Sequence, residues 1–410
     1  MKGDVSKAPA TAIAIATYIV MGGFFTQSGV ILDAAAAYFH TPIPETATLF
    51  SYLTGGNLIG LIVCLFVFNV LSIRRVLFVA YVALFAGVAL LDVTRALPVG
   101  ALAIGLCGFG AGVGLSAGAV IIAKTYALRS RAVAFLGTDC TFSLSGYVFP
   151  AFAANAIALG WMWQSGYIAV AGVAALLLVA AVFVRFPATG RAAGAAQPAV
   201  ERIAPARAAR VAVALFALGL GLYLCGQGAF LIWAPQDLET IFGLPAVGAA
   251  PVVGAFWGPS IFGLVTAALL VTRIPPRWVV IGAATLAVAS LLACTLAPDA
   301  HAFFTATFAF GFTSTCLFKL MISIGSEQIA GAPPQLVTFL LLSASIGGTI
   351  APAISAGIVN VHGPHAGIVM ALVCYCGTLA AAVAALAVER AARRPARTSG
   401  SASECIGRVS

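Results

Sequence analysis

Two charged residues inside apolar stretches are the part of this sequence that could do chemistry. Asp139 lies in "FLGTDCTFSLSG", eight residues past Arg131, and Lys319 lies in "GFTSTCLFKLMISIG". At 1.5 Å per helical residue, Asp139 lies about 12 Å beyond that last basic residue. A carboxylate at such a depth must be paired, hydrated or protonated, so we consider Asp139 a candidate proton carrier.

Each of these charges also has a simpler interpretation. Asp139 could pack against the hydroxyls of Thr138 and Thr141, and Lys319 could pair locally with Glu327 two turns later or extend to the membrane surface. The alternative is that Asp139 and Lys319, at similar depths in opposite halves of the chain, pair with each other. Both interpretations of Lys319 stay open at this point.

Other polar and aromatic side chains could bind a solute. The amides of Gln27 and Gln227 lie near the middle of apolar stretches, and an amide both donates and accepts hydrogen bonds, which suits a hydroxylated or zwitterionic solute. Helix packing is the competing interpretation for each candidate, and Asp33 is expected to be a solvated charge at a helix edge. The predicted solute-binding residues are Gln27, Asn57, Tyr147, Tyr223, Gln227 and Trp257.

Twelve apolar stretches must position these residues. The chain is 62% hydrophobic and only 8% charged, a balance that a soluble core cannot bury but a bilayer can accommodate. Each stretch is near the ~20 residues that cross hydrocarbon as a helix. The expected spans are 10–32, 47–71, 76–93, 98–123, 132–158, 162–184, 210–234, 252–272, 278–297, 302–324, 335–360 and 366–388.

The basic residues between these stretches lie almost entirely on one side. Nineteen of the 21 Lys and Arg residues fall in alternate gaps or at the ends, the exceptions being Arg95 and Lys319. Positive loops are retained in the cytoplasm. The sequence therefore predicts a multi-pass protein of the bacterial inner membrane with both termini in the cytoplasm, and the net charge of +9 reflects topology rather than nucleic-acid binding.

The two halves of the sequence repeat. A shift of 203 residues aligns Gly60 with Gly263 and Arg74 with Arg277, and a shift of 202 aligns the pattern [ST]xSxxGxxxPAxxA, including Pro150 with Pro352. Six spans per half imply parallel repeats. The expected organisation is a six-helix bundle over 1–184, a basic linker over 185–209, a second six-helix bundle over 210–388 and a basic tail over 389–410, with linker and tail disordered or interfacial.

Six plus six helices, a basic central linker and a basic turn after the second helix resemble the major facilitator superfamily over essentially the whole chain. Within it, "YFHTPIPETATLFSYLTGGNLIG", "FLGTDCTFSLSGYVFP", "YLCGQGAFLIWAP" and "IGSEQIAGAPPQLVTFLLLSASIGG" resemble the TsgA-type transporters, near the fucose:proton symporter branch. The superfamily's loop signature G-x-L-x-D-R-x-G-R-R is degraded to "FVFNVLSIRRV", where Asn69 lies near the expected Asp and only Arg74 and Arg75 keep the basic end.

This resemblance implies an all-α protein of two pseudo-symmetric six-helix bundles around a central site, which acts as a secondary active transporter by alternating access. Asp139, Lys319, Arg74 and Arg75 are the expected gate residues on the cytoplasmic side, and Asp139 the expected site of proton coupling. A sugar-like or other small polar metabolite is the expected substrate of a monomeric protein in contact with lipid. Efflux of drugs or metabolites, or a sensor that moves no solute, are the alternatives.

The sequence favours no enzyme, cofactor or metal. The formal GxSxG at Gly114–Gly118 lies in an apolar helix without a placed His/Asp pair, and no GxxxxGK[ST] occurs. Nine scattered cysteines lack a CxxC and are interpreted as packing residues. His40, His301, His362 and His365 all fall at the outer face, where loop histidines are usually solvated.

Overall fold

The computed structural model describes residues 7–68, 70–126, 128–187, 207–328 and 334–393, which form fifteen α-helices. Asn69 and most of the predicted linker and tail lie outside these ranges. The helices are α1 (Lys7–Thr26), α2 (Ser28–Phe39), α3 (Ile43–Ala47), α4 (Leu49–Val67), α5 (Ile73–Val93), α6 (Leu97–Thr125), α7 (Leu128–Ala158), α8 (Ser165–Phe183), α9 (Arg207–Phe242), α10 (Ala246–Ala249), α11 (Pro251–Leu270), α12 (Pro276–Thr295), α13 (Ala300–Ser326), α14 (Pro334–His362) and α15 (His365–Arg393).

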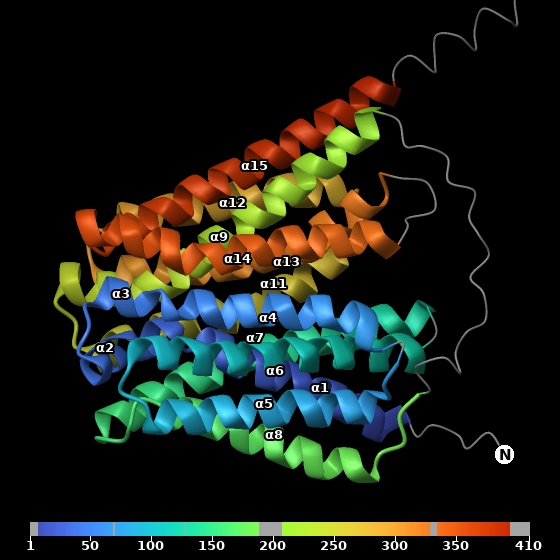
Figure 1. Cartoon of the computed structure of the whole chain (residues 1–410). Coiled ribbons are helices and arrows are strands. Elements are labelled where there is room, and N and C mark those ends of the chain that lie inside the picture. The colour runs from blue at the N-terminus through green and yellow to red at the C-terminus, as the bar shows by residue number, and fades with distance from the viewer. Residues whose placement is uncertain (1–6, 69, 127, 188–206, 329–333, 394–410) are drawn as a thin grey trace, which may run out of the picture.

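The helices run roughly side by side between two ends of the molecule (Figure 1). Eleven helical segments in the described part of the chain are long and apolar enough to cross a membrane. α7 is 31 residues long and follows the same direction, but it carries more polar residues, among them Asp139. With α7 included, the twelve expected spans are confirmed as an all-α membrane fold.

Two spans extend beyond their expected ends. The first, expected over 10–32, breaks at Gln27 into α1 and α2 and continues to Phe39. The seventh, expected to end at 234, continues through Pro235 to Phe242. A proline removes one hydrogen bond from a helix interior without ending the helix when neighbouring helices hold it in place. Pro150 and Pro352 likewise lie inside α7 and α14, as expected.

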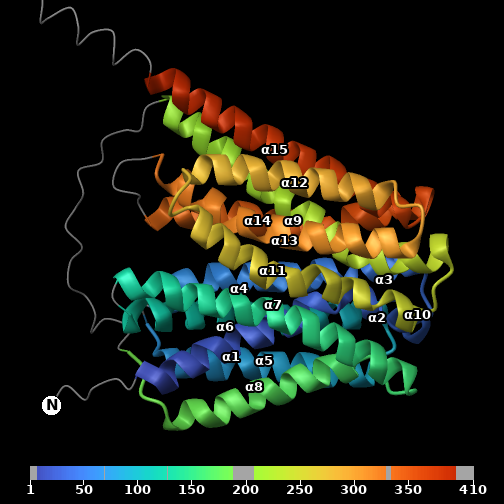
Figure 2. The ribbon, with the colours of Figure 1, turned by 180° about the vertical axis from the view of Figure 1, so that it is seen from behind.

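The helices form two bundles, α1–α8 and α9–α15, which Figure 2 shows from the opposite side. Each bundle has its own large cluster of buried apolar side chains, although a few residues of α9 and α14 join the first cluster. We call the end where α1 begins and α15 finishes the terminal end, and the opposite end, where the chain turns from α14 into α15, the far end.

The predicted repeat has equivalent packing in the two bundles. A Cβ atom added to Gly60 of α4 would lie 2.7 Å from the carbonyl oxygen of Phe109 in α6. One added to Gly263 of α11 would lie 1.8 Å from the carbonyl oxygen of Phe312 in α13. Phe109 and Phe312 are themselves 203 residues apart, so the same helix pair approaches closely at the same point in both halves.

Candidate functional site

An ion pair joins the two bundles within the predicted membrane region. α7 positions Asp139 and α13 positions Lys319, with the Lys319 Nζ atom 3.3 Å from Asp139 Oδ1. Tyr18 of α1 places its hydroxyl where it interacts with both charges and with Thr138. Of the partners considered for Lys319, the structure therefore provides the one in the opposite half and not Glu327.

The surroundings of this pair differ on its two sides. The Asp139 side chain is 18% exposed, whereas that of Lys319 is 48% exposed. Lys319 reaches across to Asp139 of the other bundle while about half of its own side chain stays accessible. A partly exposed pair contributes less to stability than a fully buried one, because solvent screens its charges.

Two more predicted residues, Tyr223 and Gln227, are linked to Lys319 through Phe318. The Lys319 ammonium lies 5.6 Å from the centre of the Phe318 ring, and Phe318 stacks on Tyr223 of α9 at 6.1 Å between ring centres. The Tyr223 hydroxyl accepts a hydrogen bond from Gln227 Nε2 at 3.3 Å. Tyr375 of α15 packs against the same Tyr223 ring. Tyr223 and Gln227 are therefore connected to the ion pair through one aromatic side chain.

Trp257 and Tyr147 lie at the seam between α7 and α11, where the bundles touch. The Trp257 ring meets Phe142 edge-on at 5.2 Å and covers Gly146, where a Cβ atom would come within 2.4 Å of it. Its indole N–H is buried and finds no acceptor among the described residues. Tyr147 is 53% exposed and lies against Gly254, beside a crevice of about 190 Å³.

Gln27 and Asn57 face neighbours in their own bundle. Gln27 Nε2 donates to the carbonyl of Gly23, and its Oε1 atom lies against Gly166 of α8. The Asn57 Oδ1 atom lies against Gly112 of α6. Both oxygens are buried and lack a hydrogen-bond partner in the described part of the chain. Their direction favours helix packing, and their roles as solute ligands stay predictions.

The two aligned arginines hold each bundle together at the terminal end. Arg74 of α5 donates to the carbonyl of Val184, at the end of α8, at 2.9 Å. Arg277 of α12 forms an ion pair with Glu389 of α15. Each arginine thus ties the third span of its half to the last span of the same half. A gate role for Arg74 and Arg75 stays a prediction.

The bundles are in close contact at the far end. Gly29 of α2 lies against the carbonyl oxygens of Leu231 and Ile232 in α9, where an added Cβ atom would come within 2.2 Å and 2.8 Å of them. Ser51 of α4 accepts a hydrogen bond from the backbone N–H of Ala353 in α14 at 3.1 Å. The structure is therefore closed at the far end while Lys319 remains accessible.

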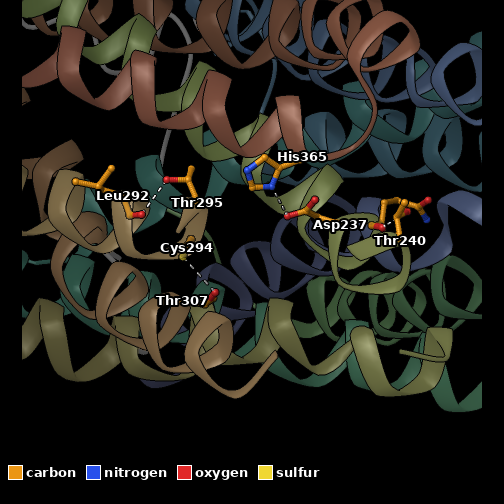
Figure 3. Close-up of polar contacts among 8 residues, drawn as sticks. Asp237, Thr240, Leu292, Cys294, Thr295, Thr307 and His365 are labelled. Atoms are coloured by element: carbon orange, nitrogen blue, oxygen red, sulfur yellow. Dashed lines mark hydrogen bonds and ion pairs between the residues drawn. The ribbon is translucent and has the colours of Figure 1, made fainter. Parts of the chain in front are cut away.

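Sequence reasoning missed a second pair of titratable groups at the far end. His365 Nδ1 lies 3.1 Å from Oδ2 of Asp237, whose side chain is 1% exposed (Figure 3). Asp237 was overlooked because its span was expected to end before Pro235, and His365 was expected to be solvated. Asp33, expected to be a solvated edge charge, has its Oδ1 atom buried and its carboxyl close to that of Glu239. The continued apolar spacing of Leu238, Ile241 and Phe242 was the available signal.

The described residues contain no cluster of three or more His, Cys, Asp or Glu side chains suited to a metal ion. The described cysteines are all free thiols.

The sequence profile of the Major Facilitator Superfamily matches residues 13–331. The TsgA homolog of Erwinia tasmaniensis is 28% identical over 358 residues, which cover 87% of this chain and 89% of the relative. Protein TsgA of Salmonella arizonae is 26% identical over 364 residues, which cover 88% of this chain and 90% of the relative.

Solved structures share the fold at low identity. The nucleoside transporter NupG superposes with a TM-score of 0.70 at 11% identity, over 93% of this chain and 98% of its own. A bacterial homolog of the human lysosomal transporter Spinster, in an inward-facing conformation, superposes with a TM-score of 0.70 at 12% identity, over 94% of this chain and 99% of its own. The transporter FucP, in its outward conformation, superposes with a TM-score of 0.61 at 15% identity, over 92% of this chain and 99% of its own.

Proposed function

The chain belongs to the major facilitator superfamily of small-solute transporters, and on that premise we propose proton-coupled secondary transport by alternating access. The bundles over 1–184 and 210–388 rock about the space between them and expose it to one side at a time. The ion pair between Asp139 and Lys319 is the single observation that carries the coupling proposal, because it joins the two moving parts with a titratable group.

In this proposal, a proton that binds Asp139 neutralises the carboxylate and releases Lys319. The bundles then lose one attraction between them near the terminal end. Deprotonation restores the pair. Because Lys319 is accessible and the far end is closed, we place proton exchange from Asp139 in this conformation on the terminal side.

We propose a hydroxylated solute, such as a nucleoside or a sugar. Tyr223 and Gln227, which Phe318 links to the ion pair, and the unpaired Trp257 indole at the seam between the bundles supply donors, acceptors and stacking surfaces. One solved structure with this fold is a nucleoside transporter. We further propose a bacterial inner-membrane location with cytoplasmic termini, since the relatives are bacterial and 19 of the 21 Lys and Arg residues fall in alternate gaps between the spans or at the ends of the sequence.

The test begins with a thermal-shift screen of the purified protein against nucleosides, sugars, amino acids and organic acids at two pH values, because a bound ligand raises the melting temperature. Hits are then added to proteoliposomes that enclose a pH-sensitive dye. We expect solute-driven proton flux that Asp139→Asn abolishes while it retains binding. Asp299→Asn, which removes the N-cap acid of α13, is the matched control and should keep the flux.

Two results would count against the proposal. If Asp139→Asn carries solute-driven proton flux at the wild-type rate, Asp139 is not the coupling site. If no hydrophilic solute shifts a cooperative melt, export of apolar compounds or a sensor role becomes the better conclusion. The pair is tested separately: exchanging the two charges should restore the transport that each single reversal loses, and failure of this rescue argues against the pair as a gate.

A further inference from the structure

The structure holds a buried acid that the proposed transport cycle does not use. Asp237 lies in α9 two residues past Pro235, and its side chain is 1% exposed. Its Oδ2 atom is 3.1 Å from His365 Nδ1, and its Oδ1 atom is buried without a hydrogen-bond partner among the described residues (Figure 3). A buried carboxylate is costly unless an opposite charge and hydrogen bonds compensate it.

The partner of this acid can be reached by protons. His365 is the first residue of α15, at the far end, and its side chain is 38% exposed. Imidazole is the side chain that ordinarily changes charge between about pH 5 and pH 8. A protonated His365 balances the charge of Asp237, whereas a neutral ring leaves the buried carboxylate with one hydrogen bond and no counter-charge.

Few other titratable groups face this pair. The Cys294 thiol of α12 is near enough to interact with Asp237, and it also contacts the Thr307 hydroxyl of α13 at 3.8 Å. α10 and α11 carry no titratable residue. The remaining titratable groups at the far-end parts of the surrounding helices are Asp33 and Tyr38 of α2, Asp299 and His301 at the start of α13, and His362 of α14. Of these, Asp33 faces Glu239 of α9.

The segment that carries Asp237 also closes the far end. Pro235 has no N–H to donate to the carbonyl of Leu231, so α9 lacks one internal hydrogen bond at this point. That same carbonyl lies against Gly29 of α2, with Ile232 beside it. The contact with Gly29 therefore lies just before the point where α9 has one internal hydrogen bond fewer. Beyond that point, Asp237 contacts α15 and Glu239 faces Asp33 of α2.

We propose that Asp237 and His365 form a proton-binding site that holds the far end closed. The proton resides on His365, and the resulting ion pair anchors the end of α9 against α15 in the position that meets α2. When the proton leaves, the uncompensated carboxylate draws water and the end of α9 separates from α2. This inference rests on the fold and these contacts, not on the solute or on Asp139.

The direction of the pH effect follows from this cycle. The closed state binds the proton more tightly than the open state, so closure is favoured at low pH and weakens as the pH rises and the pair loses its proton. One linked proton changes an equilibrium constant by at most about tenfold per pH unit. The open state also binds this proton, only less tightly, so opening changes by less than this maximum. We therefore expect the equilibrium constant for opening to increase about tenfold between about pH 5.5 and about pH 7.5.

The test is hydrogen–deuterium exchange of the full-length protein in nanodiscs at these two pH values. The amide exchange rate of the α2 peptide over 28–39 is divided by the exchange rate of the same peptide when unstructured at that pH. The ratio then reports opening of the far end. All proteins carry Glu239→Gln, which removes the nearby pair of carboxyls as a second pH-dependent contact. The added variants are His365→Gln, Asp237→Asn and, as the matched control, His362→Gln.

We expect the tenfold pH effect in the Glu239→Gln protein and in its His362→Gln derivative, and its loss in both the His365→Gln and the Asp237→Asn derivatives. A thermal melt of each variant confirms that it is folded, and if one of the two site variants fails to fold, the other decides. The proposal is overturned if a folded site variant keeps the tenfold effect, or if the Glu239→Gln protein shows none.

Discussion

Gly29 permits a close approach between the two bundles, and replacing it with alanine tests the closed far end directly. The new Cβ atom would lie 2.2 Å from the Leu231 carbonyl oxygen and 2.8 Å from that of Ile232. Ordinary contact begins near 3.4 Å, so α2 and α9 would have to separate by about 1.2 Å. Both obstacles are main-chain atoms, which a change of side-chain rotamer cannot move.

Overpacking of this kind costs about 1–3 kcal/mol. The cost falls on the closed state alone, because the carbonyls belong to the other bundle and are absent from the surroundings of Gly29 once the far end opens. One tenfold change corresponds to about 1.4 kcal/mol. The opening equilibrium should therefore shift by about 5-fold to 150-fold.

Hydrogen–deuterium exchange of the α2 peptide over 28–39 measures this shift directly. Gly357→Ala in α14 is the matched control, since its Cβ atom would meet no other heavy atom within 4 Å and it gains the same helix propensity. We expect faster exchange in Gly29→Ala and wild-type exchange in Gly357→Ala, with little change in melting temperature for either. Wild-type exchange in Gly29→Ala would show that the far end is not closed by this contact.

Three further predictions concern stability. Arg277→Ala should lower the free energy of unfolding by about 0.5–1 kcal/mol through loss of the ion pair with Glu389, in which the Arg277 side chain is 36% exposed, and a loss that does not shrink in high salt would contradict the electrostatic explanation. Trp233→Phe removes the buried 2.8 Å hydrogen bond to Ser355, which should contribute about 1 kcal/mol; in a Ser355→Ala background the cost of Trp233→Phe should fall by about this amount, leaving the cost of the lost packing, as a double-mutant cycle of unfolding free energies would show. Gly263→Ala places a Cβ atom 1.8 Å from a main-chain oxygen within one bundle, so it should lower the melting temperature of the whole protein by several degrees, and an unchanged melt would refute the packing argument.

Much of the candidate site could be located from the sequence, but its contacts could not. Asp139 and Lys319 stand out because a charge inside an apolar span is rare and costly. Whether Lys319 meets Glu327 on its own helix or Asp139 in the other half depends on how α7 and α13 face each other. Gln27 differs from Lys319, because its side chain was expected to face a solute between the bundles but turns toward Gly166 of its own bundle.

Helix ends were the weakest expectation, with consequences for function. Pro235 was interpreted as the end of a span, yet α9 continues for two more turns. Those turns carry Asp237 and Glu239, so the whole far-end group of acids was absent from the expected site. A proline in a packed helix removes one hydrogen bond, and only the neighbouring helices decide whether the helix continues.

The sequence by itself determined the class of this protein: apolar stretches of membrane-spanning length, their number and their repeat are linear patterns imposed by the bilayer. Only the tertiary structure decided which polar groups meet. Pairing across bundles depends on helix rotation, on close approaches such as that of Gly29, and on where a proline-containing helix stops. These are set by packing between residues up to 200 or more positions apart, such as Gly29 and Leu231, and no local pattern encodes them.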